Sequence, residues 1–110
     1  MPPMTHTEID RCSLAMDREI ARRLREDPAL IEVARRNLKR WLGRPRLSVS
    51  MKRCYDEWQT ILDTYSLEQL LQLLKDEGEE AQRLRQNSPF VGILSPREVW
   101  AIKERFRNAA

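Results

Sequence analysis

Residues 49–65 read VSMKRCYDEWQTILDTY, and their spacing predicts the central helix of the fold. The large apolar side chains recur three and then four residues apart, which places them along one side of a helix. They are Met51, Cys54, Tyr55, Trp58, Ile61, Leu62 and Tyr65. Lys52, Arg53 and Asp56 fall on the opposite side, which can stay in water. We therefore expect a half-buried helix whose aromatic rings supply much of the core.

The segment nearest the start predicts a first helix. Thr7 can cap it, with Asp10 as the reciprocal partner three residues later. Its apolar positions are Ile9, Cys12, Met16, Ile20 and Leu24. The helix should end near Glu26, because the residue before Pro28 disfavours helical geometry.

A second helix is predicted from there to Leu42, with Asp27 as its cap and Pro28 in its first turn. Its inward positions are Leu30, Ile31, Ala34, Leu38, Trp41 and Leu42. Gly43 should end it in the left-handed conformation, and Pro45 cannot continue it.

Serine residues mark the starts of the later helices. Ser48 or Ser50 can cap the central helix, and Ser66 with Gln69 forms a capping-box signature for the next one. That helix should bury Leu67, Leu70, Leu71 and Leu74. Gly78 either separates it from a further helix through Gln86, with Ala81 and Leu84 inward, or only kinks one continuous helix.

The last third of the chain predicts a break and a final helix. Residues 87–89 end the preceding helix, and residues 90–94 should form an extended apolar segment whose Phe90, Ile93 and Leu94 plug the core. Ser95 as cap, Pro96 at the first position and Glu98 three residues from the cap then predict a helix with Val99, Ile102 and Phe106 along its seam.

These elements predict an all-α bundle of five or six helices in one domain. The chain has 110 residues, of which 41% are hydrophobic and 34% are charged, values typical of a globular domain. We expect residues 1–6 to be a mobile terminus and residues 7–110 to form the domain. No segment resembles a membrane span or a secretory signal, so we expect a cytoplasmic protein with no membrane partner.

Positive charge is concentrated between residues 35 and 53, which include eight basic residues and no acidic one. These are Arg35, Arg36, Lys39, Arg40, Arg44, Arg46, Lys52 and Arg53. Such a segment favours a phosphate backbone or an acidic protein surface, although an ordinary solvated face has the same composition.

Residues 83–94 are a second candidate for partner binding. Arg83, Arg85, Ser88, Pro89 and Phe90 combine arginines, a proline break and bulky apolar groups, as interface hot spots do. The alternative is that the apolar members pack in the core. Trp41, Trp58 and Trp100 carry the same ambiguity.

Catalytic and metal-binding patterns do not emerge from this sequence. His6 is the only histidine, Cys12 and Cys54 are far apart, and the three glycines stand alone. Neighbouring carboxylates such as Asp56 and Glu57 point in different directions on a helix. We expect no enzymatic activity, no metal and no cofactor.

Several segments resemble a family of short bacterial helical proteins, the antitoxins of toxin–antitoxin operons. They are DRCSLA at residues 10–15, ARRNL at 34–38, the pair Glu57-Trp58, and above all EAQRLRQNSPFVGIL at 80–94. The resemblance implies a protein that sequesters a co-encoded toxin, with a nucleotidyltransferase-type enzyme as the associated partner. The runner-up hypothesis is a small basic regulator that binds DNA or RNA.

Overall fold

The computed structural model describes residues 5–107, and these form six α-helices and one 3-10 turn. The α-helices are α1 (His6–Glu26), α2 (Ile31–Leu42), α3 (Val49–Thr64), α4 (Leu67–Lys75), α5 (Glu79–Arg85) and α6 (Pro96–Arg107), and the 3-10 turn η1 covers Pro28–Leu30. The predicted all-α bundle of five or six helices is confirmed. None of the helices within residues 5–107 has the length and apolar character to cross a bilayer.

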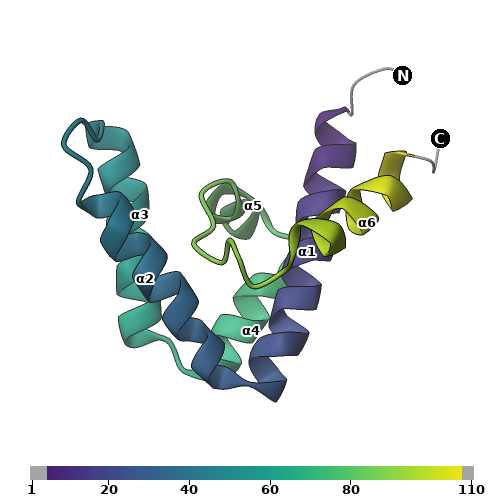
Figure 1. Ribbon diagram of the computed structural model, residues 1–110, viewed down its shortest axis with the longest axis horizontal. Helices are drawn as coiled ribbons and strands as arrows, with labels where there is room; N and C mark the ends of the chain where they lie inside the picture. The colour runs from purple at the N-terminus through teal and green to yellow at the C-terminus, as the bar shows by residue number, and fades with distance from the viewer. Residues whose placement is uncertain (1–4, 108–110) are drawn as a thin grey trace.

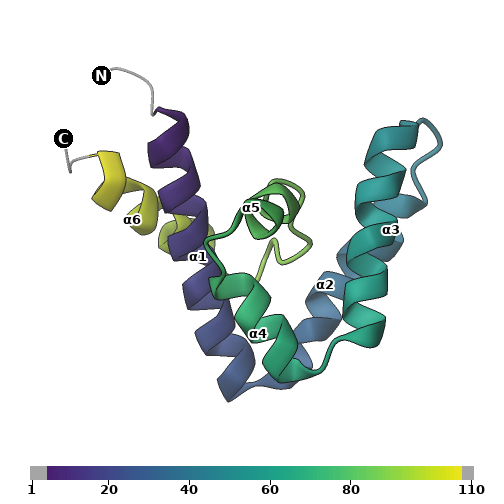
Figure 2. The same cartoon turned by 180° about the vertical axis from the view of Figure 1, so that it is seen from behind.

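The helices are arranged as two arms that diverge from a common base (Figure 1). The α1 arm consists of α1 with α4 and α6 packed against it, and the α2–α3 arm is a helical hairpin. Seen from both sides, α5 and the loop after it lie between the arms (Figures 1 and 2). The radius of gyration is 14.3 Å, slightly more than the roughly 13 Å of a compact chain of this length.

The space between the arms is filled by residues from α5 and its following loop. Phe90 is 1% exposed and meets the Trp58 ring edge-on, with the ring centroids 5.6 Å apart. Trp58 Nε1 donates a hydrogen bond to the carbonyl oxygen of Leu84, 3.0 Å away. Leu94 is also buried, so Phe90 and Leu94 occupy the core as predicted, while Ile93 is half-buried.

The loop of residues 90–94 is turned rather than extended, which corrects the prediction. The Ile93 N–H donates to the carbonyl oxygen of Phe90 at 3.4 Å, and Gly92 has a φ of +99°. A positive φ at the third residue is typical of a tight turn and favours glycine. The turn directs Phe90 and Leu94 into the core and leaves Val91 exposed.

Three serine caps are confirmed at the starts of α3, α4 and α6. The Ser48 hydroxyl accepts from the Met51 N–H, Ser66 and Gln69 form the predicted capping box, and the Ser95 hydroxyl accepts from the Glu98 N–H. Each bond satisfies a backbone donor that the first helical turn leaves without a partner.

The predicted cap of the first helix is wrong. Thr5, not Thr7, caps α1, and its hydroxyl accepts from the Glu8 N–H at 3.2 Å. Asp10 is not a capping partner, because its carboxylate accepts a hydrogen bond from the Gln82 side chain of α5. The predicted mobile segment therefore includes two residues, Thr5 and His6, that belong to the start of α1, and its residues 1–4 lie outside the described part of the chain.

Two details of the second helix are also corrected. Asp27 makes no side-chain capping bond, because residues 28–30 form a separate 3-10 turn before α2 begins at Ile31. Gly43 ends α2 with a φ of −82°, which is ordinary helical backbone and not the left-handed conformation.

The central helix keeps its predicted stripe over its middle. Tyr55, Trp58, Ile61 and Leu62 are buried, whereas Met51 and Cys54 are half-buried. Tyr65 lies one residue beyond the end of α3 and is 43% exposed, so it was wrongly assigned to the stripe. Farther along, Gly78 separates two helices, and the kinked continuous helix is excluded.

Candidate nucleic-acid or protein interface

The eight basic residues of the 35–53 segment lie on the α2–α3 arm, but three of them are engaged within the chain. Arg35 binds Asp63 at the end of α3, with Nη1 and Oδ1 2.6 Å apart, and donates to the carbonyl oxygen of Leu62 at 2.8 Å. Lys52 pairs with Asp56 one helical turn away at 2.8 Å. Arg35 therefore helps hold α2 against α3, which reduces its availability to a partner.

Arg40 is the third engaged residue and acts through Asn37. Arg40 Nη2 donates to Asn37 Oδ1 at 2.9 Å. The buried amide nitrogen of Asn37 donates in turn to the carbonyl oxygens of Pro89 and Val91, each at 2.8 Å. Arg40 is exposed, yet it also orients the amide that joins α2 to the loop after α5.

The other five basic residues define what we call the basic-arm surface. All five are exposed, and within residues 5–107 none lies within ion-pair distance of a carboxylate. They are Arg36, Lys39, Arg44, Arg46 and Arg53. Their positive charge is uncompensated locally, so it is available to an external anion or acidic surface.

The second predicted interface, residues 83–94, is mostly structural. Arg83 binds both oxygens of Glu57 on α3, at 3.0 and 2.7 Å, and also pairs with Glu80. These carboxylates, Glu80 first, raise the pKa of the Arg83 guanidinium. Arg83 therefore links α5 to the α2–α3 arm, and its remaining capacity for a partner is small.

Arg85 is almost completely enclosed. Its side chain is 6% exposed, and its Nε donates to Asp17 Oδ2 on α1 at 3.0 Å. Its Nη2 donates to the carbonyl oxygen of Asp76 at 2.8 Å, just after α4. Burial raises the pKa of Asp17 to about 6, although Arg85 opposes that shift. The pair fastens α1, α4 and α5 together.

The remaining predicted partner-binding residues, Ser88, Pro89 and Phe90, lie in the loop after α5. Pro89 and Phe90 are both buried. Ser88 is half-buried, and its hydroxyl accepts from the Phe90 N–H at 3.3 Å. The burial of Pro89 and Phe90 agrees with the alternative of core packing, and partner binding by this segment stays a prediction.

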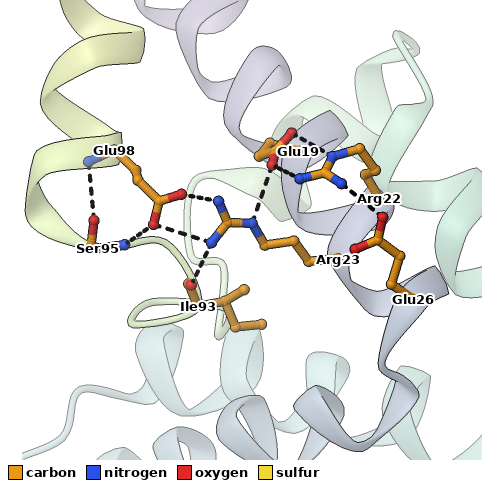
Figure 3. A network of polar contacts seen from close by, with 7 residues as sticks. All are labelled: Glu19, Arg22, Arg23, Glu26, Ile93, Ser95 and Glu98. Atoms are coloured by element: carbon orange, nitrogen blue, oxygen red, sulfur yellow. Dashed lines mark hydrogen bonds and ion pairs between the residues drawn. The ribbon is translucent and has the colours of Figure 1, made fainter.

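The loop is also anchored from its far end by α1 (Figure 3). Arg23 binds both carboxylate oxygens of Glu98 in the first turn of α6, and its Nη1 lies 3.4 Å from the carbonyl oxygen of Ile93. Glu19 accepts from Arg22 and Arg23, and these bonds, that of Arg22 first, lower the pKa of Glu19 to about 2. The start of α6 is thereby fixed against the C-terminal part of α1.

Sequence reasoning missed an apolar groove between α1, α6 and the loop after α5. It has a volume of about 550 Å³ and is lined largely by apolar side chains. Trp100 and Val91, both on its lining, are 54% and 64% exposed. The available signal was Trp100, which follows the α6 seam residue Val99 and is followed by Lys103 one turn later.

The other candidate groups of the sequence fall outside any reactive cluster. His6 is exposed in the first turn of α1, and no three potential metal ligands gather within residues 5–107. Cys12 is buried, which raises the pKa of its thiol, and Cys54 is half-buried. Trp58 is in the core, and Trp41 is half-buried, with its ring centroid 5.2 Å from that of Tyr55.

Comparison with known proteins gives no match to a family model, a curated protein or a solved structure. The resemblance to bacterial antitoxins thus stays a prediction from the sequence segments themselves.

Proposed function

We propose that this protein is a non-enzymatic binding protein, and specifically an antitoxin that neutralises a co-encoded toxin by protein–protein contact. The observation that carries the proposal is the basic-arm surface, five exposed cations without a local carboxylate partner on the hairpin of α2 and α3. Charges that are not neutralised within a chain accelerate and orient association with a surface of opposite sign.

The chemistry of the proposed partner complements this surface. The active site of a nucleotidyltransferase-type toxin contains metal-binding carboxylates and nucleotide phosphates. Arginine side chains bind carboxylates through paired hydrogen bonds, so Arg36, Arg44 and Arg46 are suited to cover such a site. The hairpin that presents them is held by Arg35 and Asp63, which limits the ordering cost of binding.

A charge-reversal experiment tests this proposal. The protein would be co-expressed with the product of its neighbouring gene, and both their association and the growth arrest caused by that product would be measured. Arg36→Glu combined with Arg44→Glu should weaken association at least tenfold and restore the growth arrest. The melting temperature should change little, because neither side chain makes an ion pair in the described chain.

The matched control reverses two exposed cations elsewhere. Arg11→Glu with Lys75→Glu changes the net charge equally but lies on α1 and α4, away from the hairpin. This variant should retain association within about threefold. If both double variants bind equally well, or if the neighbouring product does not associate with the wild type, the proposal fails.

A small DNA- or RNA-binding regulator is the second candidate, favoured by the same five cations. Three of them, Arg36, Lys39 and Arg53, are on helices, and Arg44 and Arg46 are on the connecting loop. Phosphate binding by such residues would weaken steeply as salt increases, with a slope that reflects the number of phosphates contacted. A duplex-binding titration between 50 and 200 mM salt distinguishes this candidate, because only the regulator should shift DNA with that dependence.

A further inference from the structure

The apolar groove on the α1 arm has an unusual floor. Its lining includes Met16 and Ile20 of α1, Val99 of α6 and Phe90 of the loop. It also includes Asp17 and Arg85, which we call the floor because both are almost enclosed. The side chains of this ion pair are only 7% and 6% exposed. An acid and a base thus lie almost enclosed beneath an otherwise apolar surface.

In the described part of the chain, each member of the pair has one polar atom without a hydrogen-bond partner. Arg85 donates from Nε and Nη2, and Asp17 accepts at Oδ2, but no hydrogen bond within residues 5–107 involves Arg85 Nη1 or Asp17 Oδ1. In the same residues, every fully enclosed side-chain nitrogen or oxygen has a partner. These two atoms are therefore still reached by solvent, and both residues line the groove.

We infer that this groove binds an apolar segment of a partner protein that places a neutral amide group on Asp17 and Arg85. The ion pair is neutral overall, so an ion of either sign in the groove would meet one attractive and one repulsive charge. A primary carboxamide, such as an asparagine or glutamine side chain, matches both free atoms, because its C=O accepts from Arg85 Nη1 and the N–H on the same side donates to Asp17 Oδ1.

The rim of the groove favours a polypeptide segment as the occupant. The groove volume of about 550 Å³ is also within the range of small-molecule sites and does not by itself select the occupant. Trp100 and Val91 extend apolar surface beyond the floor, being 54% and 64% exposed, and a chain longer than one side chain would cover them. Exposed aromatic groups of this kind are enriched at protein interfaces.

This inference does not depend on the proposed antitoxin function, because the groove is on the α1 arm and the basic-arm surface is on the other. If the toxin experiment fails, this inference is unaffected. If the groove test fails, the proposed antitoxin function is unaffected. Its test therefore uses defined small probes and no toxin.

The probes differ in the polar group that they can place on Asp17 and Arg85. Titrations of ¹⁵N-labelled protein, followed by NMR, would use 4-methylpentanamide, methyl 4-methylpentanoate and the capped tripeptide acetyl-Leu-Gln-Leu-amide. The amide should shift the signals of Val91, Trp100 and Arg85 Nε and bind at least fivefold more tightly than the ester, which has no donor for Asp17. The tripeptide should bind at least tenfold more tightly than the amide, because it also covers the rim.

Variants of exposed aromatic residues complete the test without disturbing the core. Trp100→Ala should weaken tripeptide binding at least fivefold, whereas Tyr65→Ala, which removes an aromatic ring 43% exposed on another surface, should change it less than twofold. Equal binding of amide and ester, equal binding of amide and tripeptide, or shifts confined to residues outside the groove would each overturn the inference.

Discussion

Asn37 shows how one side chain can join two parts of the chain that are far apart in sequence. Its amide nitrogen donates to the carbonyl oxygens of Pro89 and Val91, and its amide oxygen accepts from Arg40. An asparagine supplies both two donors and an acceptor, so all three contacts are satisfied by one group. The partners lie 52 and 54 residues away, which is why the α2 sequence gives no sign of them.

Replacing Asn37 should show how much these hydrogen bonds contribute to the free energy of unfolding. Asn37→Ala leaves two loop carbonyls without their donor, and we expect a loss of about 2–3 kcal/mol in the free energy of unfolding. Asn37→Asp should lose at least as much, because it sets a carboxylate against the same carbonyl oxygens. Urea unfolding followed by circular dichroism measures both, and a loss below about 0.5 kcal/mol for alanine would contradict this role.

Asp17 should make stability depend on pH in the direction opposite to that of an ion-paired carboxylate such as Glu19. Its pKa is about 6 in the folded protein, because burial disfavours its charged form, against 3.8 as the ordinary value. The folded state therefore binds more protons between those two values, and its contribution to stability falls as the pH rises from about 4 to about 6. Asp17→Asn should remove that slope, as measured by urea unfolding at pH 4, 5, 6 and 7.

Glu19 provides the control for this pH dependence. Its pKa of about 2 lies below its ordinary value of 4.5. Its contribution to stability is therefore present above pH 4.5 and lost between pH 4.5 and about 2. Glu19→Gln should leave the pH 5–7 slope unchanged, and a wild-type slope in that range that survives Asp17→Asn would exclude Asp17 as its source.

At the scale of elements, the sequence predicts features that depend on residues adjacent in the chain, such as helix caps. It does not predict contacts between residues that are far apart in the chain. The caps at Ser48, Ser66 and Ser95 each need only a backbone N–H three residues away, so their signatures are local and are confirmed. The pair of Asp17 and Arg85 joins residues 68 positions apart, and nothing in either local sequence indicates it. The basic segment of residues 35–53 is intermediate, because its charges are visible in the sequence but the pairing of Arg35 with Asp63 and of Lys52 with Asp56 is not.

Two glycines allow the backbone strain of a positive φ to be measured against a position with ordinary φ. Gly92 has a φ of +99°, and a Cβ there would meet no atom nearer than Val33 Cγ1 at 3.9 Å. Gly92→Ala should therefore lower the free energy of unfolding by about 1–2 kcal/mol through backbone strain alone. The matched control is Gly43→Ala, at a helical φ and with ordinary contacts, which should be neutral or stabilise by up to about 1 kcal/mol. Similar losses at both positions would contradict the assignment of strain to Gly92.

For the whole molecule, the decisive feature is that α5 and its following loop lie between the two arms and contact both. α5 and its following loop reach the α2–α3 arm by Phe90 on Trp58 and by Arg83 on Glu57. The same segment reaches the α1 arm by Arg85 on Asp17. This short segment thus helps to set the relative position of the basic-arm surface and the apolar groove, together with η1, which contacts both α1 and α2.

Removing the largest side chain of that segment should uncouple the arms. Phe90→Ala leaves a cavity beside Trp58, and we expect a loss of about 3–5 kcal/mol in the free energy of unfolding. The tryptophans report each arm separately, since Trp41 and Trp58 lie on the α2–α3 arm and Trp100 lies on α6. In variants that retain only Trp58 or only Trp100, urea transitions should coincide when Phe90 is present, as expected of one cooperative domain. With alanine at position 90 the two midpoints should separate, and coincident midpoints would show that the arms are coupled by other contacts.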